Sequence, residues 1–135
     1  MLNFTIYYLR FFYILICILC FSNILYSYYF DLYLNVDSYF YTLLLSTIPL
    51  LSFLVQKKNL VKISIYSKIV AVILGYILLP LFIALPYYFS IYNITFLNAY
   101  FESVSGFTST GFTVFENIKH LDESLILWRS SSQWL

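Results

Sequence analysis

The chain has little charge of either sign. Charged side chains make up 10% of its 135 residues, against roughly 25% in an ordinary soluble domain. The seven Lys and Arg nearly balance the six Asp and Glu, so no basic surplus is left for binding nucleic acid. Hydrophobic residues account for 62% of the chain, which excludes a soluble globular domain. We therefore predict an all-α integral membrane protein.

The sequence also lacks the residue sets that enzymes use. It contains no P-loop, no GxGxxG motif and no Ser-His-Asp set, and this predicts neither an enzyme nor a cofactor. Its two cysteines, Cys17 and Cys20, have the CxxC spacing of a redox motif but lie inside an apolar run, where nothing polar lowers a thiol pKa. His120 stands beside two carboxylates in a polar turn and lacks converging ligands, so we interpret that turn as solvated.

Three long apolar runs are present, at residues 7–30, 39–55 and 63–89. Each approaches or exceeds the roughly 20 residues that a helix needs to cross a hydrocarbon core of about 30 Å. The first exceeds the apolar core of a cleaved signal peptide, and no cleavage site of small residues follows it, so we expect a retained helix. The third contains Pro80 and Pro86, which membrane helices tolerate when neighbours satisfy the freed backbone groups.

The distribution of positive charge predicts the orientation of these helices. Lys57, Lys58, Lys62 and Lys68 follow the second run, whereas the loop after the first run has no Lys or Arg. Short loops rich in Lys and Arg stay in the cytoplasm. We therefore expect the N-terminus, with Arg10, to be cytoplasmic and the loop around residues 31–38 to lie outside.

The segment after residue 89 is too short for another membrane span. Residues 99–107 allow a helix of about 14 Å, half a bilayer, before the hydroxyl-rich run at residues 108–113. A half-length helix followed by such a run is typical of a re-entrant loop, whose carbonyl oxygens can replace the hydration shell of a cation. Gly111 suits a backbone conformation that a Cβ would hinder. The spacing alone leaves a polar external loop as the alternative.

Residues 99–113 read AYFESVSGFTSTGFT. This run resembles the first pore loop of the Trk/Ktr/HKT potassium transporters, whose bacterial Trk members carry the pattern F-E-S-x-S-G-x-T-T-T-G-x-T. Both flanks agree: residues 84–86 resemble the end of the preceding family helix, and residues 127–134 resemble the start of the next one. The two helices before residue 56 look like the additional N-terminal hairpin of Trk-type proteins.

The resemblance implies a potassium uptake protein in the bacterial inner membrane, built from four helix–pore loop–helix repeats around one pore. It divides the chain into an N-terminal transmembrane hairpin, residues 1–56, and a first, incomplete repeat, residues 57–135. Potassium is the only metal ion implied, as the substrate. The implied partners are membrane lipid, the remainder of the transporter, a second copy in a homodimer and a cytoplasmic nucleotide-binding regulatory subunit. The implied filter carbonyls belong to Thr108, Ser109, Thr110, Gly111 and Phe112, with Glu102 and Thr113 as support.

Glu102 and Arg129 are ionisable groups expected at membrane depth, where such groups are functional candidates. Glu102 holds the filter by accepting backbone N–H bonds, adds negative potential for the cation, or is a structural carboxylate satisfied by hydrogen bonds, and the sequence leaves all three open. Arg129 needs a partner or a water-filled cavity at that depth, and the sequence leaves open a partner in the portion of the family's chain that is missing here. Asp122 or Ser124 is expected to cap the last helix.

The family's chain continues through further repeats, whereas this sequence stops at Leu135. We therefore expect a fragment, which as an isolated chain does not conduct because one filter strand cannot surround an ion. Two alternatives remain: a small structural or assembly subunit of a membrane complex, and an inert truncated gene product.

Overall fold

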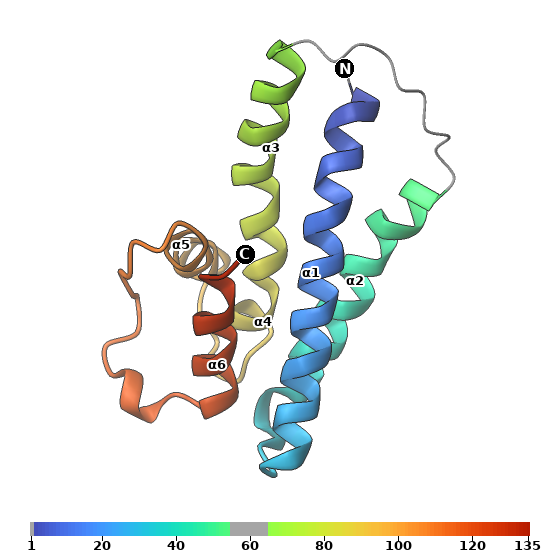
Figure 1. Cartoon of the computed structure of the whole chain (residues 1–135). Helices are drawn as coiled ribbons and strands as arrows, with labels where there is room; N and C mark the ends of the chain where they lie inside the picture. The colour runs from blue at the N-terminus through green and yellow to red at the C-terminus, as the bar shows by residue number, and fades with distance from the viewer. Residues whose placement is uncertain (1, 55–64) are drawn as a thin grey trace.

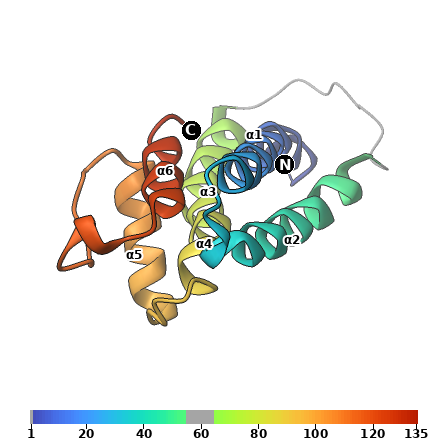
Figure 2. The ribbon, with the colours of Figure 1, turned by 90° about the horizontal axis from the view of Figure 1, so that it is seen from below.

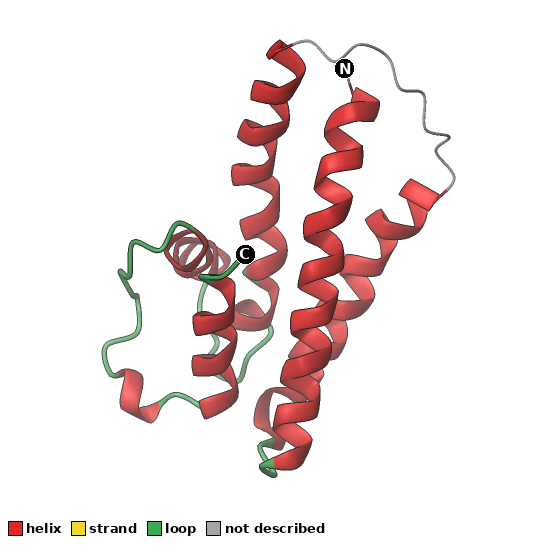
Figure 3. Ribbon diagram, in the orientation of Figure 1, coloured by secondary structure: helices red, strands yellow, loops and turns green. Residues whose placement is uncertain are grey.

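The computed structural model describes residues 2–54 and 65–135, and the side chains of residues 9–51 and 65–135. Within this part of the chain every regular element is helical (Figure 3), which confirms the predicted all-α class. Three of the four lysines that predict the orientation, Lys57, Lys58 and Lys62, lie outside the described residues.

The first two helices form a hairpin. Helix α1 spans Leu2–Tyr29 and helix α2 spans Val36–Leu54, and a short 3-10 turn, η1, at Tyr33–Asn35 joins them. The turn is closed by Asp31, whose φ of 56° lies in the left-handed region that Asp tolerates better than most residues. Both helices agree with the apolar runs in the sequence, with ends displaced by a few residues.

The third apolar run forms two helices instead of one. Helix α3 spans Ile65–Ile83, and after a break at Ala84 the four-residue helix α4 spans Leu85–Tyr88. Pro86, at the start of α4, explains the break: it has no N–H to donate to the carbonyl four residues earlier, and its ring crowds that carbonyl. Pro80 is accommodated inside α3.

The remaining helices are short. Helix α5 spans Phe96–Phe107 and helix α6 spans Glu123–Ser132, with a 3-10 turn, η2, at Ile118–His120 between them. In Figure 1 α5 is seen end-on while α1 and α3 run along the page, and in Figure 2 α1 is seen end-on while α5 runs along the page. Helix α5 therefore lies across the long helices, and the chain after it loops out before it returns along α6 (Figure 1).

Two described stretches, Leu9–Tyr29 and Ile65–Tyr88, are long and apolar enough to cross a membrane. Only 33% of the most apolar window of each is buried inside the structure. Large apolar side chains such as Phe11, Phe21 and Ile73 are more than half exposed, whereas the core helix of a soluble protein would bury them. These exposed faces fit a lipid environment.

Candidate functional site

The candidate site is the loop at residues 108–113, and α5 sets its starting position. Thr95 begins α5 by accepting a hydrogen bond from the backbone N–H of Asn98 at 3.3 Å. The helix is three residues longer at its N-terminal end than the sequence analysis predicted. Ala99 and Ser103 are buried along it, and the Ser103 hydroxyl lies 2.8 Å from the carbonyl oxygen of Pro80 on α3. These contacts fix α5 against the bend in the third apolar run.

The loop begins as a turn wrapped around the C-terminal end of α5. The backbone N–H groups of Thr108, Ser109 and Thr110 donate to carbonyls of the last turn of the helix. The hydroxyls of Thr108 and Thr110 donate to the carbonyls of Val104 and Ser105, at 2.7 and 3.3 Å. These hydroxyls satisfy backbone carbonyls in the last turn of α5, next to the loop.

Two residues of the loop have a left-handed backbone. Ser109 has a φ of 55° and Gly111 a φ of 81°. Glycine adopts this region freely, and the sequence-based expectation for Gly111 is confirmed. Serine at Ser109 is unusual there, and non-glycine residues held in this region gather at functional sites.

Glu102, on α5, holds the far end of the loop. Its side chain is fully buried, and the Thr113 hydroxyl lies 3.2 and 3.1 Å from its two carboxylate oxygens. The backbone N–H of Val114 donates to Oε2 at 2.9 Å. The Thr113 hydroxyl oxygen in turn accepts from the backbone N–H of Phe115 at 3.1 Å. The carboxylate thus accepts a backbone N–H bond from the end of the loop.

Arg129, on α6, also holds the loop in place. Its Nε lies 3.1 Å from Glu102 Oε1, and its Nη2 donates to the carbonyls of Gly111 and Phe112, each at 3.1 Å. The partner that Arg129 needs thus lies within this chain and not in the missing portion of the family's chain. Spacing along the sequence did not reveal the pair, because only the return of α6 beside α5 brings the two residues together (Figure 1). The sequence did contain one indication of this pair, because a lone carboxylate and a lone guanidinium at membrane depth favour pairing with each other.

The five predicted filter carbonyls therefore fall into two groups. The oxygen of Phe112 accepts both the Ser105 hydroxyl at 2.6 Å and the Arg129 guanidinium, and the oxygen of Gly111 accepts the guanidinium alone. Among the described residues, no donor reaches the carbonyl oxygens of Thr108, Ser109 and Thr110. All five residues are exposed. The exposed loop thus offers three consecutive free carbonyls, followed by two carbonyls that accept hydrogen bonds from Arg129 on α6.

A close approach between α5 and α6 supports this arrangement. A Cβ built on Gly106 would lie 2.5 Å from the Ser132 hydroxyl oxygen, which donates to the carbonyl of Arg129 at 2.7 Å. A larger residue at this position would therefore force the Ser132 hydroxyl to move and break its bond to Arg129. The analysis of the sequence assigned no packing role to Gly106 or Ser132.

A polar network links the hairpin to α6. The Asn35 amide donates to Asp122 Oδ2 at 2.9 Å, and Asp122 Oδ1 accepts the backbone N–H of Ser124 at 2.8 Å as the cap of α6. The Tyr39 hydroxyl donates to the Ser124 hydroxyl at 3.0 Å. The predicted cap at Asp122 is confirmed. The role of Asn35 was missed, because its partner lies 87 residues away.

The other candidates have no comparable arrangement. His120 is exposed in η2, and the described residues contain no group of three His, Cys, Asp or Glu side chains placed to hold a metal ion. Cys17 and Cys20 are free thiols, and Cys20 is fully buried in the core of the hairpin.

Three curated proteins are similar to this chain. An uncharacterised cation transporter of Methanocaldococcus jannaschii is 34% identical over 80 residues, 59% of this chain and 16% of that protein. The Trk system potassium uptake protein TrkI of Halomonas elongata is 34% identical over 85 residues, 63% of this chain and 17% of that protein. TrkG of Escherichia coli is 30% identical over 80 residues, 58% of this chain and 16% of that protein. The match thus spans about a sixth of each relative. No family model matches the chain, and no solved structure does.

Proposed function

We propose that this chain, which fits the Trk-type superfamily of cation transporters, contributes one strand of a potassium selectivity filter. In this proposal α5 is the pore helix, residues 108–112 are the filter strand and the whole segment is a re-entrant loop. The observation that carries it is that two charged side chains, Glu102 and Arg129, hold an exposed loop in place by hydrogen bonds.

The chemistry of the loop fits a dehydrated monovalent cation. Three consecutive free carbonyls offer partial negative charges at fixed positions, as oxygens that replace a hydration shell must. The C-terminal end of α5 points its dipole's negative end at the same turn, which favours a cation. Because Glu102 is neutralised by Arg129, neither side chain adds a net charge that would bind the ion too tightly to leave.

Arg129 and Glu102 act as positioning residues in this proposal. The guanidinium fixes the peptide planes of Gly111 and Phe112, while the carboxylate fixes Thr113 and Val114. These two side chains therefore hold the loop at Gly111 and after it, while the backbone bonds of residues 108–110 to the last turn of α5 hold it before Gly111. Such rigid support lets carbonyls keep a coordination geometry when an ion leaves.

The wider roles of the protein follow from the same resemblance. We propose potassium uptake across the inner membrane, with residues 1–56 as a membrane hairpin, residues 57–135 as a first repeat and a cytoplasmic N-terminus. A second copy and a cytoplasmic nucleotide-binding subunit are the proposed partners, beside the other filter strands. A single strand cannot surround an ion, so the isolated 135-residue chain is proposed not to restore growth at low potassium.

The proposal is tested by placing residues 57–135 in a complete Trk-type transporter and changing Gly111→Ser. A Cβ at a φ of 81° strains the backbone by about 1–2 kcal/mol, and the new hydroxyl competes as a ligand. We expect uptake of potassium relative to sodium to fall in cells that lack other potassium transport. Gly75→Ser is the matched control, because a Cβ there meets only ordinary contacts of 3.6 and 3.9 Å.

An unchanged potassium-to-sodium ratio in the Gly111 variant would remove this loop from the filter. Free substitution of Thr108 and Thr110 without loss of uptake would favour the alternative of a structural or assembly subunit, in which the loop is only an external connection.

A further inference from the structure

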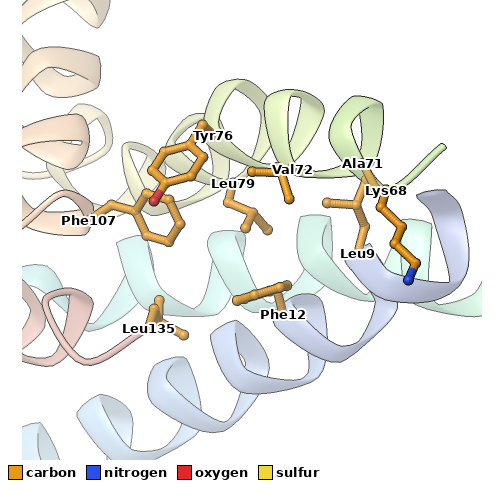
Figure 4. A pocket seen from close by; sticks show the side chains of 10 residues that line it. Leu9, Phe12, Lys68, Ala71, Val72, Tyr76, Leu79, Phe107 and Leu135 are labelled. Atoms are coloured by element: carbon orange, nitrogen blue, oxygen red, sulfur yellow. The ribbon is translucent and has the colours of Figure 1, made fainter. Parts of the chain in front are cut away.

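An apolar cavity lies between α1, α3 and the C-terminal end of α5, apart from the candidate filter. Its volume is about 440 Å³. Figure 4 shows Leu9 and Phe12 of α1 facing Val72 and Leu79 of α3, with Phe107 and Leu135 closing the other end. Tyr76 and Phe107 meet edge to face there, with ring centroids 5.4 Å apart.

A single positive charge marks the opposite end of this cavity. Lys68, in the first turn of α3, is exposed and places its amino group beside Leu9 (Figure 4). Among the described residues it forms no ion pair. The lining thus combines a long apolar wall with one cation at its mouth.

The dimensions of the cavity match one leaflet of a bilayer. Lys68 and Leu79 both line it, and Leu79 follows Lys68 by eleven positions on α3, a rise of about 16 Å. Half of a hydrocarbon core of about 30 Å is close to that length. Lys68 stands near the start of the apolar stretch Ile65–Tyr88, at the depth where lipid head groups are expected. A chain with its anionic end at Lys68 would reach the middle of the membrane along this wall.

We propose that this cavity binds an acyl chain of an anionic phospholipid, with Lys68 paired to the phosphodiester of the head group. A Lys near an anionic membrane surface contributes attraction that a zwitterionic lipid offsets with its own ammonium group. The site depends on membrane insertion and does not depend on potassium transport, so its test and that of the filter fail independently.

The test uses the 135-residue chain in vesicles that contain brominated phospholipids, which quench tryptophan at short range. Trp134 is 90% exposed and precedes the cavity-lining Leu135, so it reports on occupancy. We expect brominated phosphatidylglycerol to quench it more effectively than brominated phosphatidylcholine in wild-type protein. Trp134→Phe removes that lipid-dependent signal and assigns it, since Trp128 is fully buried.

Lys68→Gln should lower the preference for phosphatidylglycerol about fivefold, which corresponds to about 1 kcal/mol for one basic residue near the surface. Lys68→Arg should retain it. Lys119→Gln is the matched control, because Lys119 is an exposed lysine in η2 that does not line the cavity. No preference in wild-type protein, or equal loss in the Lys68 and Lys119 variants, would overturn the proposal.

A second variant tests the apolar part separately. Gly75→Leu extends a side chain into the cavity from a position where a Cβ has room, and should reduce quenching of Trp134 by both lipids. Unchanged quenching in that variant, with helical content intact by circular dichroism, would show that Trp134 senses only bulk lipid and would also overturn the proposal.

Discussion

Replacing Glu102 by Gln tests the anchoring of the loop most directly. The side chain is fully buried, and its two oxygens accept from the Arg129 guanidinium, the Thr113 hydroxyl and the Val114 N–H. Glutamine keeps the shape but replaces one oxygen by an NH2 group, which must then face another donor. The variant also leaves Arg129, whose side chain is 12% exposed, without its counter-charge.

Breaking a buried ion pair from one side costs about 3–5 kcal/mol. We expect about 3 kcal/mol, because Arg129 keeps some exposure and its two carbonyl acceptors. The free energy of unfolding is measured in detergent micelles by titration with a denaturing detergent, with the fluorescence of the fully buried Trp128 as the probe. Glu116→Gln, an exposed carboxylate in the same connection, should stay within about 0.5 kcal/mol of wild type.

The double variant Glu102→Gln, Arg129→Met should recover much of the loss, since it removes both charges from the site. Equal stability of the Glu102 and Glu116 variants would refute the anchoring role of the carboxylate. A double variant whose loss equals the sum of the losses of Glu102→Gln and Arg129→Met would show that the two side chains act independently.

Two further expectations follow from individual contacts, and a third from the distribution of the lysines. Gly106→Ala should lower the free energy of unfolding by about 1–3 kcal/mol in the same assay, because its Cβ meets the Ser132 hydroxyl. Ser132→Ala should restore the stability of that variant. A Gly106→Ala variant as stable as wild type would contradict the close approach of α5 and α6. Asn35→Leu should cost about 1.5–3 kcal/mol by leaving the buried Asp122 carboxylate without its amide donor, and no loss would mean that the hairpin and α6 are not coupled there. Reporter fusions should place Lys58 in the cytoplasm and Asn35 outside, and the reverse result would invert the orientation.

Much of the helical architecture could be predicted from local composition. The apolar runs that predict α1, α2 and α3 are long and nearly free of charge, so burial in lipid or protein is the only favourable outcome for them. The short helix α5 and the hydroxyl-rich loop after it could also be predicted, because the apolar segment there is too short to span a membrane. The break at Ala84 was not predicted, although Pro86 held the signal, since membrane helices often tolerate proline.

The sequence by itself thus determined which segments are apolar helices, where a loop interrupts them and which residue, Gly111, needs a left-handed backbone, because these properties depend on each residue and its near neighbours. Only the tertiary structure decided which distant groups meet. Arg129 reaches Glu102 and the loop carbonyls, and Asn35 reaches Asp122, because α6 folds back beside α5 and the hairpin turn. Such pairs are set by how the helices pack and by the requirement that buried charges find partners, and no spacing along the chain encodes them.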